Sequence, residues 1–362
     1  MTPRLKWTPG IGPALLAALL FGASTPLAKL LVANIEPVLL AGLLYAGSGI
    51  GLGAWLLVRR LRPREADAEA SLQRRDIPWL SGAVLFGGVL GPVLLMLGLA
   101  STPASAASLL LNLESVLTAL MAWIVFRENV DVRIFLGMVA IVTGGVLLSW
   151  TQAPPAGFPW GALAIAAACA CWAIDNNLTR AVSGGDPVQI AAIKGGVAGT
   201  INIAVALALG YRLPNAPQLV AAGAIGLTGY GISLVAFVLA LRHLGAARTG
   251  AYFSTAPFVG AALSLLLLRE VPTLSFWIAG ALMGLGVWLH VSERHEHWHE
   301  HEPLEHEHLH THDEHHQHAH GPEWDGTEPH AHLHKHEPMV HSHPHFPDLH
   351  HRHGHGRHSD QR

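Results

Sequence analysis

The sequence predicts an all-α membrane protein, with ten transmembrane helices arranged as two inverted five-helix repeats and a disordered His-rich tail. Three observations support this prediction. Only 13% of the 362 residues are charged and 51% are hydrophobic, long apolar segments recur through the first 291 residues, and 24 of the 26 His lie in residues 292–362. Soluble domains have about 25% charged residues, so the composition excludes an ordinary soluble enzyme. A net charge of −3 gives no electrostatic footprint for a nucleic-acid partner.

Ten apolar segments are each long enough to cross a hydrocarbon core, which requires about 20 residues of helix. Charged residues, Pro and Gly separate these segments from one another. The predicted spans are 11–33, 37–58, 78–100, 103–126, 132–151, 158–180, 187–209, 217–241, 246–268 and 272–291.

The positions of Lys and Arg predict the orientation of these spans. With a cytoplasmic N-terminus, 14 basic residues of the loops and helix ends face the cytoplasm and three face the outside. Cytoplasmic loops carry an excess of Lys and Arg. We therefore expect a multi-pass protein of a bacterial-type inner (plasma) membrane, with both termini in the cytoplasm.

Residues 1–151 and 152–291 resemble each other. A shift of 142 places Arg127-Glu128 on Arg269-Glu270, and a shift of 150 places Glu36-Pro37-Val38 on Asp186-Pro187-Val188. Each half has five spans, and because five is odd, the second half enters the membrane from the opposite side. Inverted repeats are a transporter architecture whose substrate site lies near the midplane. Chance similarity of Ala/Leu/Gly-rich helices is the alternative, which the matched Arg-Glu pairs disfavour.

Short motifs in both halves resemble a known family. The stretch 107–120, together with Arg127-Glu128, resembles the fourth helix of EamA-type members of the drug/metabolite transporter superfamily. Residues 21–25 resemble the polar break in that family's first helix, and residues 255–258 resemble its ninth helix. The resemblance covers roughly residues 11–291, and it implies a ten-helix inner-membrane carrier that works by alternating access.

Ionisable residues inside the predicted spans are the candidates for chemistry, because a charge at the bilayer centre costs about 2.5–3.5 kcal/mol on insertion scales. Glu114 lies near the middle of its span, two residues from Asn112, and we expect it to carry a proton across the membrane. A structural carboxyl group that hydrogen-bonds across helices is the alternative. Lys194 is expected to pair with Glu114 or Asp175 or to hold an anionic substrate group, unless it snorkels from a helix end.

Polar residues near helix breaks complete the predicted cavity. Pro26, Pro92 and Pro257 each remove a backbone donor and can expose carbonyl groups to a cavity, although neighbouring helices can also satisfy such kinks. Tyr45 and Trp172 are further candidates for wall residues, with simple packing as the alternative. The predicted cavity residues are Ser24, Thr25, Asn112, Glu114, Asp175, Asn176, Lys194, Tyr252, Ser254 and Thr255.

The third segment, residues 292–362, is dominated by the repeated pattern His-x-His. Its few apolar residues cannot form a core, so we expect disorder. Imidazole binds Zn, Cu, Ni and Co, and alternate residues of an extended chain point the same way. The predicted metal ligands are His295, His297, His299, His301, His306, His308, His310, His312, His330, His332, His334 and His336. The tail is interpreted as a metal sensor or delivery segment, a store of metal or protons, or a tolerated extension.

Together these features predict a secondary transporter that exports a small metabolite or an amino-acid-like solute, coupled to protons, with no required cofactor. A divalent transition-metal (Zn/Ni/Co) exporter and a membrane metal sensor that transports nothing are the alternatives. No nucleophile–base constellation, P-loop or dinucleotide fingerprint is present, so an enzyme is not expected. The expected partners are the lipid bilayer, a small-molecule solute, protons and transition-metal ions at the tail, with a homodimer left open.

Overall fold

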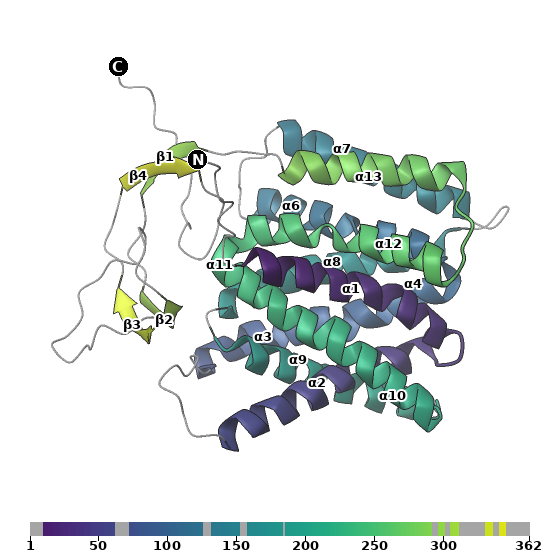
Figure 1. Cartoon of the computed structure of the whole chain (residues 1–362), viewed down its shortest axis with the longest axis horizontal. Helices are drawn as coiled ribbons and strands as arrows, with labels where there is room; N and C mark the ends of the chain where they lie inside the picture. Colours follow the sequence, from purple (N-terminus) through teal and green to yellow (C-terminus); the bar gives the residue numbers. More distant parts are fainter. Residues whose placement is uncertain are drawn as a thin grey trace, which may run out of the picture.

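The computed structural model describes residues 10–61, 72–125, 132–152, 158–183, 185–291, 296–300, 305–310, 330–335 and 340–344. The described part of residues 10–291 is a bundle of helices joined by short connections (Figure 1). Within the described residues, nine helical stretches of at least 18 residues are apolar enough to cross a membrane, and the shorter helix Leu274–His290 makes a tenth. The predicted helical membrane class is therefore confirmed for this part of the chain.

The first half of the bundle runs from α1 to α7. Two of its predicted spans are interrupted, one by a π-helical turn (η2) and the other by a break between α5 and α6. The elements are α1 (Ile11–Val32), α2 (Pro37–Leu61), η1 (Arg74–Asp76), α3 (Ile77–Ala83), η2 (Val84–Leu90), α4 (Gly91–Ser101), α5 (Ala104–Leu110), α6 (Leu113–Val125) and α7 (Val132–Gln152).

The second half runs from α8 to α13 and contains a second π-helical turn, η3. The two π-helical turns begin 142 residues apart, which is the shift that aligns the Arg-Glu pairs. The elements are α8 (Trp160–Val182), α9 (Pro187–Ala208), α10 (Ala216–Ile225), η3 (Gly226–Ile232), α11 (Ser233–Phe253), α12 (Ala256–Leu267) and α13 (Leu274–Val291).

One predicted helix boundary is wrong. The predicted spans leave a break between residues 241 and 246, whereas α11 continues to Phe253 and the chain breaks at Ser254–Thr255. In the first half, Pro103 interrupts the helix between α4 and α5, but the position 142 residues later is Gly245, which does not remove a backbone donor. The break at Ser254–Thr255 instead matches the one between α5 and α6, because the shift of 142 places Leu111–Asn112 on Phe253–Ser254. Pro257 follows in the first turn of α12.

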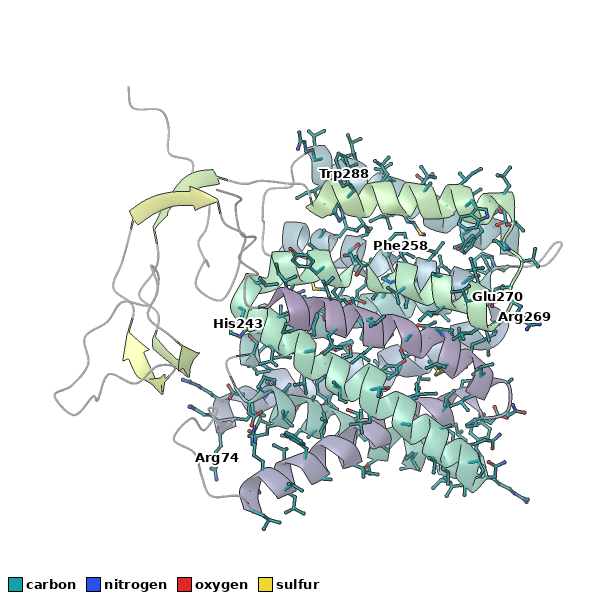
Figure 2. The ribbon with its side chains drawn as sticks, in the orientation of Figure 1. Arg74, His243, Phe258, Arg269, Glu270 and Trp288 are labelled. Atoms are coloured by element: carbon teal, nitrogen blue, oxygen red, sulfur yellow. The ribbon has the colours of Figure 1, made fainter. Side chains whose placement is uncertain are left out.

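Helices of the two halves pack against each other in matched pairs. Contacts join α2 to α9, α7 to α13, α1 to α11 and α8 to α4. Small residues allow the closest of these approaches, because a Cβ atom built on Gly49 would collide with the backbone of Gly196, and one on Gly199 with the backbone of Ala46. The outer surface carries large exposed apolar side chains such as Ile50 and Trp150. Trp288 of α13 is another (Figure 2).

The tail contains four short strands in its described segments. Strand β1 (Glu296–Glu300) pairs antiparallel with β4 (Val340–Pro344), and β2 (Glu305–His310) pairs antiparallel with β3 (His330–Lys335). The expectation of a disordered tail therefore does not hold for these segments. The alternation His-x-His has the two-residue period of a strand, which accounts for extended structure there.

Candidate functional site

A cavity of about 70 Å³ lies among the helices of both halves. A buried water requires roughly 10–15 Å³ of such space, so the cavity has room for several waters or a small solute group. The lining comes from α1, α2 and α6 of the first half and from α8, α9, η3 and α11 of the second. The lining residues are Phe21, Tyr45, Glu114, Trp172, Asp175, Asn176, Lys194, Gly229, Tyr230, Ser233, Leu234, Phe237 and Phe253.

A buried ion pair forms one side of this cavity. Lys194 Nζ of α9 lies 2.6 and 2.8 Å from the two carboxylate oxygens of Asp175 in α8. Thr179, one helical turn beyond Asp175, donates to Asp175 Oδ1 at 2.9 Å and accepts from Lys194 Nζ at 3.3 Å. The side chains of Lys194 and Asp175 are only 2% and 10% exposed. A buried ion pair offsets the cost of desolvation only where the two charges are in close contact and their remaining hydrogen-bonding groups have partners. The bidentate contact between Lys194 and Asp175, together with the hydroxyl group of Thr179, meets both conditions.

Glu114 forms a second polar point on the cavity wall. The chain breaks at Leu111–Asn112, so that Glu114 lies in the first turn of α6, where the helix dipole favours a carboxylate. Its Oε1 accepts a hydrogen bond of 2.6 Å from Asn176 Nδ2. Within the described residues, no Lys, Arg or His forms an ion pair with Glu114.

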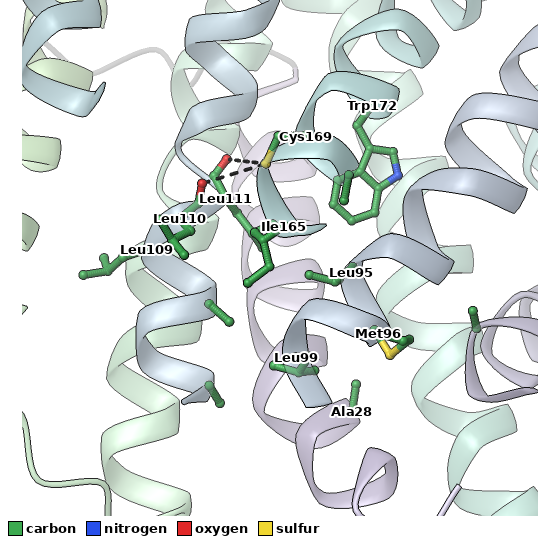
Figure 3. Close-up of a cluster of buried hydrophobic side chains, with 14 of the residues drawn as sticks. Ala28, Leu95, Met96, Leu99, Leu109, Leu110, Leu111, Ile165, Cys169 and Trp172 are labelled. Carbon is green, nitrogen blue, oxygen red and sulfur yellow. Dashed lines mark hydrogen bonds between the residues drawn. The ribbon is translucent and has the colours of Figure 1, made fainter. Parts of the chain in front are cut away.

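The break before α6 frees backbone carbonyl groups, and neighbouring polar side chains satisfy them. The thiol of Cys169 lies 3.8 and 3.9 Å from the carbonyl oxygens of Leu110 and Leu111, within the range of weak sulfur hydrogen bonds (Figure 3). Asn112 Nδ2 donates to the carbonyl of Leu109 at 2.9 Å. These contacts hold the break in place and so fix where Glu114 enters the cavity.

The aromatic wall depends on the π-helical turn η2 and on Pro92. Pro92 has no N–H group to offer the carbonyl five residues earlier, that of Gly87. Tyr45 Oη and Trp172 Nε1 donate to that carbonyl at 2.6 and 3.1 Å. Gly87 is also required sterically, because a Cβ atom there would collide with the carboxylate of Asp175. At Pro92, side chains of neighbouring helices therefore satisfy the freed carbonyl group, which is the alternative to its exposure in a cavity.

A packed apolar cluster separates the cavity from one end of the bundle. Figure 3 shows Trp172, which lines the cavity, at one end of this cluster and Leu99 and Ala28 at the other. Leu95, Met96, Leu99 and Ile165 are fully buried within it. No lining residue of the cavity lies beyond this cluster in the described structure.

Polar contacts tie the helices together at that end. Lys29 Nζ donates to the carbonyls of Leu99 and Thr102, at 2.5 and 2.8 Å. Glu270 accepts from the backbone N–H groups of Ala104 and Ser105, at 2.8 and 3.0 Å, and so caps α5. Arg269 has a φ of 52°, which ends α12 and turns the chain toward α5. Figure 2 shows Arg269 and Glu270 at this end and Arg74 and His243 at the opposite end.

The predicted cavity residues are divided between the cavity and other places. Glu114, Asp175, Asn176 and Lys194 line the cavity together. Six others do not line it in the described structure. Ser24, Thr25 and Asn112 are buried nearby in the helices, Tyr252 packs beside the small cluster of Ala14, Ala240 and Leu244, Ser254 donates to the carbonyl of Gly250, and Thr255 donates to that of Tyr252.

Sequence reasoning missed most of the aromatic lining. Tyr45 and Trp172 were candidates for the wall, but Phe21, Tyr230, Phe237 and Phe253 were not assigned to it. Tyr230 stands between Gly229 and Gly231, and such a bulky residue in a glycine-rich turn is the one signal in the sequence that points to it. The three phenylalanines are indistinguishable by sequence from those that face lipid.

The predicted metal ligands lie in the tail. Eight of them fall within the strands, and His295, His301, His312 and His336 lie outside the described residues. Among the described residues there is no group of three or more His, Cys, Asp or Glu side chains arranged to hold a metal ion.

Apolar helices that surround a small compartment lined by Glu114, Asp175 and Lys194 define a multi-pass membrane protein with an internal polar site. The chain belongs to the EamA-like transporter family, whose model matches residues 8–150 and again residues 159–292. The resemblance in the sequence motifs is thereby confirmed, and the protein is a membrane transporter and not an enzyme.

Two known proteins are similar to this chain. A protein named "Uncharacterized transporter" from Methanothermobacter thermautotrophicus (strain Delta H) is 29% identical over 289 residues, covering 75% of this chain and 83% of the relative. A protein of known crystal structure is similar with a TM-score of 0.58 and 20% sequence identity, covering 77% of this chain and 95% of the other. At that identity the second likeness concerns the fold alone.

Proposed function

We propose that this chain is a secondary transporter of the inner membrane, which exports a small metabolite or an amino-acid-like solute in exchange for protons. The single observation that carries this proposal is the cavity in which Glu114, Asp175 and Lys194 meet between the two halves of the bundle. Ionisable side chains at membrane depth mark substrate and proton pathways in transporters.

Two inverted repeats, residues 1–151 and 152–291, provide the movement in this proposal. The two successive matches of one family model support the repetition, and so does the pairing of α2 with α9 and of α7 with α13. The glycine residues at the contact between α2 and α9 have no side chains that interlock, so the two helices can slide past each other. Alternating access then follows from rocking one repeat against the other around the cavity.

The packed cluster and the ties at Lys29 and Glu270 favour a conformation that is closed at one end. By the Lys and Arg count this end is the outer one, because Arg74 and His243 lie at the opposite end (Figure 2). Both termini are then cytoplasmic. The structure therefore supports a state in which the cavity is barred from the outside.

Glu114 is the proposed proton carrier. It lines the cavity with a half-buried side chain, and its carboxyl group contacts Asn176 instead of a cationic side chain in the described structure. The other titratable groups around it are Asp175 and Lys194, which neutralise each other, together with Tyr45, Tyr230 and Cys169. Glu114 is thus the carboxylate of the cavity that has no cationic partner among the described residues, and binding of a proton neutralises it.

Proteoliposomes test this proposal. The full chain is reconstituted with an internal pH dye and exposed to a metabolite extract, and proton movement is recorded. Wild type should move protons when solute is added, and Glu114→Gln should not. Glu36→Gln is the matched control, because Glu36 is an exposed carboxylate outside the cavity. Solute transport by Glu114→Gln with an unchanged pH dependence would refute the coupling. A metabolite survey of deletion and overexpressing strains then identifies the solute.

The tail is proposed to bind transition-metal ions independently of the cavity. Its His-x-His repeats supply borderline ligands for Zn, Ni, Co and Cu. The mainly aromatic cavity favours an organic solute over a metal ion as the transported species.

A further inference from the structure

We propose that the transported solute is a monovalent organic cation, an amine or quaternary ammonium with a flat apolar body and no free carboxylate. This inference rests on the proposed function and deepens it, since it names the substrate class of the same cavity. It follows from which charges in the cavity are already neutralised, which one is not, and what surrounds that charge.

Lys194 has no donor left for an anionic substrate. An ammonium group has three N–H donors. Those of Lys194 are occupied by Asp175 Oδ1, Asp175 Oδ2 and Thr179 Oγ1, at 2.6, 2.8 and 3.3 Å. The side chain is 2% exposed, so a solute carboxylate would have to break a buried ion pair to reach it. The expectation that Lys194 holds an anionic substrate group therefore finds no support in this geometry.

Glu114 remains as the uncompensated charge among the described residues that line the cavity. Its partner is the neutral amide of Asn176, at 2.6 Å, whereas Asp175 is already matched by Lys194. The ionised compartment accordingly has a net charge of −1. A monovalent cation restores neutrality there, and so does a proton, which gives an exchange of one for the other at the same carboxylate.

The rest of the wall is suited to a cation of this kind. Aromatic faces carry negative electrostatic potential, and cages of such faces bind quaternary ammonium groups. Six aromatic residues line the cavity, and their rings form one connected set. Phe21 contacts Trp172, Tyr230 and Phe253 at centroid distances of 5.8, 5.9 and 5.4 Å, and the set extends to Tyr45 and Phe237.

Binding measurements test the inference. They use three charged probes that share a phenyl ring and differ in the sign of their charge. The full chain in detergent is titrated with benzyltrimethylammonium as the cation, benzenesulfonate as the anion and phenylalanine as the zwitterion. We expect the cation to bind at least tenfold more tightly than the other two. Glu114→Gln should weaken its binding tenfold or more, and Tyr230→Leu should weaken it severalfold. Glu36→Gln should leave it unchanged.

Proton movement in proteoliposomes separates this inference from the proposed function. Phenylalanine or benzenesulfonate could drive proton movement while benzyltrimethylammonium neither binds nor drives it. In that case the proposed substrate class is wrong and the proposed proton-coupled transport is retained. If benzyltrimethylammonium binds in a Glu114-dependent way but moves no protons, the proton-coupled function is wrong and the recognition of cations stands. Equal affinity of wild type and a monodisperse Glu114→Gln variant for the cation would also overturn the inference.

Discussion

The ion pair between Lys194 and Asp175 should behave as a single buried unit. Lys194→Met keeps the length of the side chain but leaves the carboxylate of Asp175 with Thr179 as its described partner. Removing one member of a buried ion pair typically costs about 3–5 kcal/mol of folding free energy, because the other charge stays buried and unpaired. The exposures of 2% and 10% place this pair in that regime.

The second variant and the double variant complete a thermodynamic cycle. Asp175→Asn should be destabilising for the same reason, since it leaves the ammonium group of Lys194 without its counter-charge. The double variant Lys194→Met/Asp175→Asn removes both charges and should be more stable than the sum of the single effects by roughly 0.5–3 kcal/mol, the usual range for contacting pairs. Unfolding in mixed micelles with increasing SDS measures all four proteins.

The ion pair between Arg59 and Asp186 supplies the control. The Arg59 side chain is 46% exposed at the end of α2, and the Asp186 carboxylate, although only 5% exposed, keeps hydrogen bonds from the backbone N–H groups of Val188 and Gln189. Arg59→Met should therefore be less destabilising than Lys194→Met. The reasoning fails if Lys194→Met is no more destabilising than Arg59→Met. It also fails if the double variant loses the full sum of the single effects.

Three further predictions concern the packing of α2 against α9, the end of the bundle at which Glu270 caps α5, and the tail. Gly49→Ala should lower thermal stability because its Cβ atom would strike the backbone of Gly196, whereas Gly53→Ala meets nothing within 4 Å and should be neutral or slightly stabilising; melting curves in detergent compare the two. Glu270→Ala removes two charge-assisted hydrogen bonds from α5, each worth about 1.5–3 kcal/mol, and should raise maleimide labelling of Thr102→Cys from the outside, whereas Glu36→Gln should not. Deleting residues 292–362 should abolish retention on an immobilised-nickel column while leaving the melting temperature of the helical body unchanged, and equal retention of both proteins would exclude the tail as the metal-binding segment.

Much of the fold is predictable from local composition. Apolar length alone identifies the membrane segments, because a bilayer imposes that length on every span. The break at Pro103 is likewise a local property of the chain. The second half has no matching break, since Gly245 permits a helix that Pro103 forbids, and the predicted end of this span at residue 241 is therefore wrong.

The candidate site likewise has one part that is predictable from local sequence and another part that depends on tertiary packing. Charge is rare inside spans, so Glu114, Asp175 and Lys194 are conspicuous in the sequence. Their partners are not, because which of them pair depends on the approach of α8 to α9. The aromatic wall is harder still to predict, since Phe237 and Phe253 belong to a helix whose apolar residues face both the cavity and other surfaces. Only tertiary packing distinguishes those directions.

The π-helical turns have a consequence for how the cavity can change during evolution. Such a turn accommodates one extra residue within an otherwise α-helical run. Excising one of the residues of Val84–Phe86 would therefore restore α-helical winding and leave the two flanking helices in nearly the same orientation. In a regular α-helix each carbonyl accepts from the N–H group four residues later, so the carbonyl of Gly87 would pair with Gly91 in place of Tyr45 and Trp172. The helices could survive such a deletion, whereas the aromatic side chains would lose the carbonyl group that anchors them.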